Sequence, residues 1–167
     1  MRHARSLWTL CALLVATLAV GGCGFALRGS AALPAELQPL ALLNVDNGTP
    51  LGQELLRALV SNGVELATQA SGASYQLEVG NEAAAERALS VNANARAGEY
   101  ELTMSVPWQL RRGADVVLGP ETLSLGKVYL ADPDNAIAKN EEAELIRAEM
   151  RRELALQLLR RLQVFVP

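Results

Sequence analysis

Histidine and cysteine are nearly absent from this chain of 167 residues, which contains one histidine and two cysteines. His3 and Cys11 lie within the first 22 residues, and the other cysteine is Cys23. If residues 1–22 are removed, the remainder has no imidazole and a single thiol. This excludes zinc, copper and haem sites built on histidine or cysteine, and catalytic triads that need a histidine base. It also excludes an internal disulfide, so a packed core must hold the domain together.

Basic residues are also in the minority. The chain has 15 Lys and Arg residues against 18 Asp and Glu, and two of the arginines lie in the first 22 residues. The remainder therefore has 13 basic and 18 acidic residues, a formal charge of −5, which argues against nucleic-acid binding. Its length of about 145 residues predicts one domain. It contains no second apolar run of membrane-spanning length.

The beginning of the chain has the pattern of a bacterial lipoprotein signal. A cationic start at residues 2–5 precedes an apolar run at residues 7–20 that is too short and too early for an ordinary spanning helix. Two glycines then precede Cys23, and such small residues give a peptidase access to the bond. We expect residues 1–22 to be a cleaved signal peptide and Cys23 to carry the lipid that anchors the chain.

Two alternatives remain for this segment, an uncleaved signal anchor or a plain secretory signal followed by an incidental cysteine. Gly24 follows Cys23 at the position where lipoproteins retained in the inner membrane commonly have aspartate, so we expect an outer-membrane location. Residues 23–38 lack clear periodicity and are expected to form a lipid-anchored tether. Residues 39–167 are expected to form the single folded domain.

The domain begins with the patterns of a strand and then a helix. Residues 40–45 are an apolar run closed by the turn sequence Asp-Asn-Gly, which predicts a buried strand. Thr49 and Pro50 suit the N-cap and first turn of a helix that stops at Asn62-Gly63. The apolar positions at helical spacing are Leu51, Leu55, Leu56, Leu59 and Val60.

A long strand and a hairpin follow. The alternating apolar pattern over residues 75–91 is interrupted by small residues, and Ala83-Ala84-Ala85 suits either a helix or a strand. One long strand that is bent or bulged is the favoured prediction. Residues 100–110 alternate without a break, and residues 116–130 can return as their antiparallel partner. Pro107 lies on the outward face and lacks an N–H, which places it at an edge or at a locally unpaired position.

The longest helical pattern covers residues 136–162. Its apolar stripe runs from Ile146 to Leu162, with acidic residues near the start and basic residues near the end, which suits the helix macrodipole. The order is then β-α-β-β-β-α. We expect an α+β fold in which two helices pack on one face of a small four-stranded mixed sheet.

Two groups of acidic residues contain the residue types of a catalytic or a calcium site, but not the sequence pattern that such a site requires. Glu99 and Glu101 lie on one side of a strand, but no pocket pattern surrounds them, so a solvated face is favoured over a glycosidase pair. Asp132, Asp134 and Asn135 resemble the start of a calcium loop but lack its glycine and closing glutamate. We therefore expect that the protein is not an enzyme and uses no metal or cofactor.

Several short segments occur in an order that is typical of one lipoprotein family. They are Cys23-Gly24-Phe25-Ala26-Leu27-Arg28-Gly29, Asn62-Gly63-Val64-Glu65, Glu99-Tyr100, Lys127-Val128-Tyr129, Ala138-Lys139-Asn140 and Glu149-Met150. Through these segments the chain resembles the LPS-assembly lipoprotein family LptE over nearly all of its length after residue 22.

The resemblance implies a non-enzymatic role. LptE proteins have two helices on a four-stranded sheet, lie in the lumen of the outer-membrane β-barrel LptD as plug and assembly partner, and bind lipopolysaccharide. It therefore implies an outer-membrane, lipid-anchored protein, with its domain on the periplasmic side or inside the barrel, that takes part in lipopolysaccharide transport and insertion. The alternative is a free-standing periplasmic lipid carrier or adaptor lipoprotein with an acyl ligand beneath its helices.

Contact with lipopolysaccharide would pair Lys or Arg with the phosphates of lipid A. Lys139 matches the family's basic position at the start of the last helix and is the first candidate. Arg96, in the loop before the hairpin, is the second, and Arg87 and Lys127 are further candidates for the same surface. The alternative for Lys139 is a helix residue that contacts only solvent.

Overall fold

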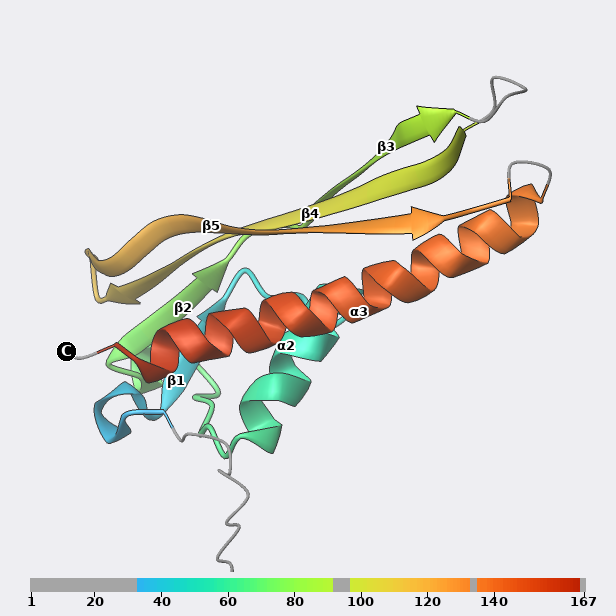
Figure 1. Cartoon of the computed structure of the whole chain (residues 1–167). Coiled ribbons are helices and arrows are strands. Elements are labelled where there is room, and N and C mark those ends of the chain that lie inside the picture. The colour runs from blue at the N-terminus through green and yellow to red at the C-terminus, as the bar shows by residue number, and fades with distance from the viewer. Residues whose placement is uncertain (1–32, 92–96, 133–134, 166–167) are drawn as a thin grey trace, which may run out of the picture. The chain divides into compact units, whose positions relative to one another are not determined.

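The computed structural model describes residues 33–91, 97–132 and 135–165. In this part of the chain the elements follow the predicted order, with the strand expected over residues 75–91 divided in two (Figure 1). The elements are η1 Ala35–Leu37, β1 Leu40–Leu43, α2 Pro50–Ser61, η2 Ala70–Gly72, β2 Tyr75–Val79, β3 Ala83–Val91, β4 Ala97–Arg112, β5 Asp115–Leu130 and α3 Ala136–Gln163.

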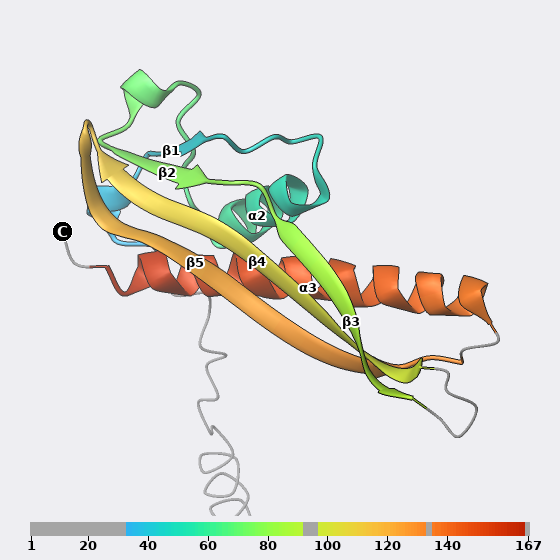
Figure 2. The ribbon, with the colours of Figure 1, turned by 90° about the horizontal axis from the view of Figure 1, so that it is seen from above.

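The strands form one mixed sheet around β4. β5 pairs antiparallel with one edge of β4 along nearly its whole length. β2 and β3 therefore share the other edge, where β2 pairs with residues 108–111 and β3 with residues 97–105. β1 pairs parallel with β2. The predicted mixed sheet is confirmed. The single bent or bulged strand predicted over residues 75–91 is instead two strands, β2 and β3, which follow one another along a single edge of β4 (Figure 2).

The interruption between β2 and β3 lies opposite Pro107. Proline has no N–H to donate, so a neighbouring strand cannot complete the hydrogen-bond ladder at this point. The Gly80 N–H donates to the Pro107 carbonyl at 2.8 Å, and β3 then begins at Ala83. The predicted locally unpaired position is confirmed, and one proline accounts for the division of the edge into two strands.

The core lies between one face of the sheet and the two helices, which pack on that same face (Figure 1). The inward side chains of β4 are at most 2% exposed, and they are Leu102, Met104, Val106, Trp108 and Leu110. The buried residues of α3 are Ala143, Met150, Leu154, Ala155, Leu158, Leu159 and Leu162. In the described part of the chain, no helix combines the length and the apolar character needed to cross a membrane.

Local signals set the bounds of α2. The Thr49 hydroxyl accepts a hydrogen bond from the Gly52 N–H at 3.1 Å, and Gly63 adopts a φ of +73° just beyond the end of the helix. The predicted apolar stripe is wrong at one position, because Val60 is 61% exposed and Ala58 is buried instead. The buried stripe of α2 is therefore rotated slightly from the predicted one.

The folded core also includes residues from the segment expected to be a tether. Leu33 and Leu37 are 4% and 0% exposed and belong to the same apolar cluster as β4. Leu37 lies in the short η1 turn just before β1. The chain therefore enters the core before residue 39.

Gly80→Ala should destabilise the domain, because a Cβ at this position would lie 2.7 Å from Cγ of the rigid Pro107 ring. We expect a loss of about 1–3 kcal/mol in the free energy of unfolding, measured by chemical denaturation. Gly98→Ala in β4 is the control, since a Cβ there meets no atom within 4 Å. Equal stability of the two variants would show that the close approach at Pro107 is unimportant.

Candidate functional site

Ion pairs connect α3 to β3 and to the residue just before it. Arg151 Nη2 lies 2.8 Å from a carboxylate oxygen of Glu82, and Glu86 pairs with both Lys139 and Arg147. Every partner on the helix is basic and every partner on the other side is acidic. The helix therefore presents a positive side toward β3.

Toward β5 the polarity is reversed. Lys127 Nζ lies 2.9 Å from a carboxylate oxygen of Glu149 and 3.5 Å from one of Glu153. The contact with Glu149 is the main cause that raises the pKa of Lys127. Because α3 is basic on one side and acidic on the other, these contacts define how the helix is turned about its axis.

Lys139 lies in a cluster of aromatic and charged side chains at the start of α3. Its Nζ is 3.7 Å from the centre of the Tyr100 ring, which is a cation–π distance. Tyr100 stacks on Tyr129 with ring centroids 5.5 Å apart. Together with Glu86 and Arg147, these residues form what we call the Lys139 cluster.

The contacts within the Lys139 cluster shift three pKa values. The hydrogen bond from Lys139 is the main reason that the pKa of Glu86 lies below its usual range, and the same bond raises the pKa of Lys139. Burial raises the pKa of Tyr129, and the nearby charge of Glu86 raises it further. At neutral pH the cluster therefore contains an ionised carboxylate, an ammonium group and a protonated phenol.

The structure separates the predicted cationic residues. Lys139 and Lys127 both lie on the helix-covered side of the sheet. Arg87 is opposite Glu101 in the register, pairs with it, and lies on the other face. Arg96 and Cys23 lie outside the described residues.

Of the Lys139 cluster, only Lys139 was predicted as a site residue. Tyr100 and Tyr129 stood in family-typical segments without a predicted role, and Glu86 and Arg147 were not predicted at all. A signal for Arg147 was present, because Lys139, Ala143 and Arg147 are spaced by four residues and so share one helix face. Ala143 is 2% exposed, and its small side chain allows close approach to the sheet. No local pattern pointed to Glu86, which depends on the pairing of β3 with β4.

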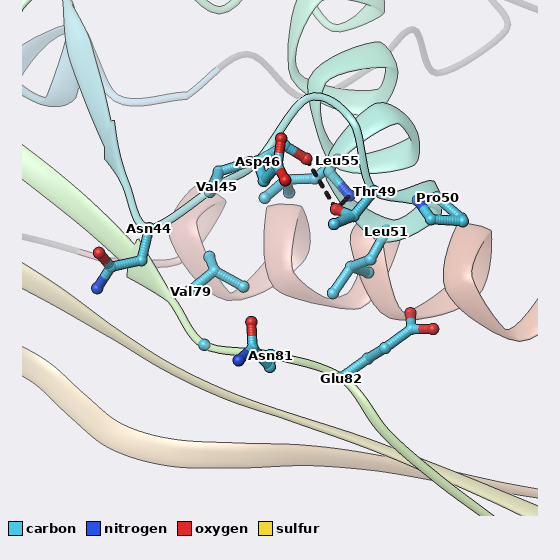
Figure 3. Close-up of a pocket in the computed structure, with 12 residues that line it drawn as sticks. Asn44, Val45, Asp46, Thr49, Pro50, Leu51, Leu55, Val79, Asn81 and Glu82 are labelled. Carbon is cyan, nitrogen blue, oxygen red and sulfur yellow. Dashed lines mark hydrogen bonds between the residues drawn. The ribbon is translucent and has the colours of Figure 1, made fainter.

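A pocket of about 260 Å³ opens between the β1–α2 connection and the break between β2 and β3 (Figure 3). Its floor is apolar, formed by Leu51, Leu55 and Val79, and its rim includes Asn81 and Glu82. Within residues 33–91, 97–132 and 135–165, no group of three or more potential ligands from His, Cys, Asp and Glu could hold a metal ion. The pocket is therefore a small hollow with an apolar floor and a polar rim.

The lowered pKa of Glu86 predicts a pH-dependent contribution to stability. Its ion pairs stabilise the fold above the ordinary glutamate pKa of about 4.3, and this contribution is lost as the pH falls through the folded-state pKa. At neutral pH Glu86→Gln should reduce the free energy of unfolding by roughly 0.5–1 kcal/mol. In strongly acidic solution the two proteins should be equally stable. Denaturation at both pH values measures the difference, and a difference that does not change with pH would contradict the assignment.

Comparison with known proteins identifies the family to which these features belong. The model of the LptE family, described as lipopolysaccharide-assembly, matches residues 37–162. An LPS-assembly lipoprotein LptE from Yersinia pestis (strain Pestoides F) is 35% identical over 164 residues, which cover 97% of this chain and 77% of the relative. The protein of the same name from Yersinia pseudotuberculosis (serotype O:1b, strain IP 31758) matches with the same identity and coverage.

Solved structures of bacterial lipoproteins share the fold. Rare lipoprotein B from Shewanella oneidensis superimposes with a TM-score of 0.65 at 26% identity, covering 72% of this chain and 90% of that one. An uncharacterized lipoprotein B from Nitrosomonas europaea reaches 0.70 at 18% identity, over 83% of this chain and 88% of that one, and supports the fold alone. Since the family model covers most of the sequence and the relatives align with nearly all of it, this chain belongs to the lipopolysaccharide-assembly lipoprotein family LptE.

Proposed function

We propose that this protein is an outer-membrane lipoprotein, anchored by a lipid on Cys23, that assembles with the β-barrel LptD and plugs its lumen. In this role it takes part in the transport of lipopolysaccharide and its insertion at the outer membrane, without catalysing a reaction. Its domain lies on the periplasmic side or inside the barrel. Membership of the LptE family supports the part in lipopolysaccharide assembly.

The face of the sheet that the described helices leave uncovered is the observation that favours a plug. Both helices pack on the other face, and two ion pairs lie on the open one, Arg87 with Glu101 and Arg111 with Glu78. Apart from apolar side chains near the end of β5, this face is mostly polar. The lumen of an outer-membrane barrel is polar, so such a face is compatible with contact to its inner wall.

We also propose that the protein binds lipopolysaccharide, with Lys139 as the principal contact. Lys127 is held by two glutamates, and Arg87 lies on the opposite face, so neither joins Lys139 in one surface. Arg96 remains a second candidate. The pairing of a Lys ammonium with a lipid A phosphate is a charge-assisted hydrogen bond, which is stronger than a neutral one.

The carrier alternative rests on the apolar pocket beside α2. Leu51, Leu55 and Val79 form its floor and also line a small gap in the core between the helices and the sheet. An acyl chain could enter there. However, a volume of about 260 Å³ is below the 300–1,000 Å³ that is usual for a site that encloses a drug-sized ligand, so the plug remains the stronger proposal.

Co-purification tests the assembly. The full-length chain with a C-terminal tag, expressed in a bacterium together with LptD of that bacterium, should retain the barrel after extraction in mild detergent. Cys23→Ala is the matched control for the anchor, and it should carry no fatty-acid label. Absence of any barrel from the natural chain would rule out the plug, and recovery with a lipid but no barrel would favour the carrier.

Removal of the Lys139 charge tests lipopolysaccharide binding. Lys139→Gln should lower the affinity for lipopolysaccharide by roughly fivefold, because one charge-assisted contact with a phosphate is lost. Arg57→Gln removes an equal charge from an exposed position of α2 and should leave the affinity unchanged. Equilibrium binding in non-ionic detergent measures both, and an equal effect of the two changes would remove Lys139 from the site.

A further inference from the structure

Glu86 occupies a small site whose donors suit an anion. Its two carboxylate oxygens face different cations, since Oε1 pairs with Lys139 Nζ and Oε2 lies 3.4 Å from Arg147 Nη2. Tyr129 is 5% exposed and close enough to Glu86 for the charge to raise its pKa. Its hydroxyl nevertheless makes no hydrogen bond of normal geometry among the described residues. Tyr129 therefore adds to the two cations a buried donor, beside the carboxylate, that the ion pairs do not engage.

The donors of this site are positioned by α3 and by ring contacts, and not by the Glu86 carboxylate. Lys139 and Arg147 project from one face of α3, on either side of the buried Ala143. Tyr129 stacks on Tyr100, and the Lys139 ammonium lies over the Tyr100 ring. We therefore expect the arrangement of donors to persist when the carboxylate leaves.

The site is open to an anion from solution. The side chains of Lys139, Glu86 and Arg147 are 23–24% exposed, so the contacts are only partly screened by protein. In the described part of the chain, β3 pairs with β4 alone, and its other edge is unpaired. A glutamate on such an edge strand can rotate toward solvent without disturbing the sheet.

We propose that Glu86 is an internal stand-in for a phosphate monoester, and that the anionic headgroup of a lipid displaces it from Lys139, Arg147 and Tyr129. A phosphate monoester carries about −1.5 to −2 charges at neutral pH and has three acceptor oxygens, one for each donor. This inference rests on the proposed function, in which the lipid is lipopolysaccharide. Glu144, which also pairs with Arg147, is 65% exposed, so solvent screens its charge.

Other ion pairs in the described residues lack this combination. Lys127 is held by two glutamates, and the pair of Arg151 with Glu82 includes no unused hydroxyl. Arg87 pairs with an acid on the opposite face of the sheet. The Lys139 cluster joins two cations to a buried donor that the ion pairs do not engage.

Glu86→Gln tests the stand-in, because it removes the competing charge and keeps the shape of the side chain. Binding is measured with the full-length chain in non-ionic detergent, using lipid A in mixed micelles and inorganic phosphate as separate probes. We expect the affinity for lipid A to rise by roughly three- to tenfold. Glu101→Gln changes the net charge equally on the opposite face and should leave the affinity unchanged.

Tyr129→Phe tests the unused donor. The change should leave the stability of the free protein nearly unaltered, because the hydroxyl makes no hydrogen bond of normal geometry among the described residues. It should lower the affinity for lipid A by about threefold, in the natural chain and in the Glu86→Gln background alike. A purely structural role of the hydroxyl would alter stability and not affinity.

The two probes separate the sources of the phosphate. A higher affinity of Glu86→Gln for both probes supports the site and shows that a free anion suffices. A higher affinity for lipid A alone supports a lipid-bound phosphate. A higher affinity for inorganic phosphate alone would overturn the lipid as ligand.

The controls separate this inference from the proposed function. If the natural chain binds lipid A and Glu86→Gln does not change the affinity, or Glu101→Gln changes it equally, the stand-in is overturned and the proposed function survives. If no variant binds lipid A, both the stand-in and the proposed lipopolysaccharide binding are overturned.

Discussion

Burial of the inner face of β4 is the constraint on which the rest of the structure depends. Its side chains from Leu102 to Leu110 are at most 2% exposed, and strands on both edges satisfy its backbone. Each such apolar side chain stabilises the fold by about 1.5–3 kcal/mol relative to exposure. After Cys23 the sequence contains no cysteine, so this core replaces any covalent support. It also requires both helices on one face, which leaves the other face of the sheet polar.

The ion pairs around α3 affect the orientation of this helix more than the free energy of unfolding. Pairs this exposed contribute about 1 kcal/mol or less each. Their arrangement is nevertheless ordered, since basic residues face β3 and acidic residues face β5. Turning the helix about its axis would bring Glu149 and Glu153 toward Glu82 and Glu86, and like charges would then oppose one another. The apolar stripe and the two charged flanks therefore favour the same orientation.

The arrangement of the charges also explains how a protein of net negative charge could bind the anionic ligand that we propose. A formal charge of −5 after residue 22 would repel lipopolysaccharide if the basic residues were evenly spread. Instead, Lys139 and Arg147 converge on Glu86 in the first half of α3, and this carboxylate offsets part of their charge. In the proposed function this part of α3 would meet the lipid, and the polar open face of the sheet would meet the barrel. The two partners would thus use different surfaces.

Much of the fold was predictable because its signals are local. Unbroken alternation over residues 100–110 predicted the central strand, and Pro107 predicted an unpaired position, since side-chain periodicity and a missing N–H act within one segment. The sequence by itself also determined the order of helices and strands, and its resemblance to a family pointed to Lys139. Only the tertiary structure decided that Lys139 meets Glu86, 53 positions away, and that Arg87 lies on the opposite face. These contacts depend on strand register and helix docking, which bring together residues that no local pattern relates.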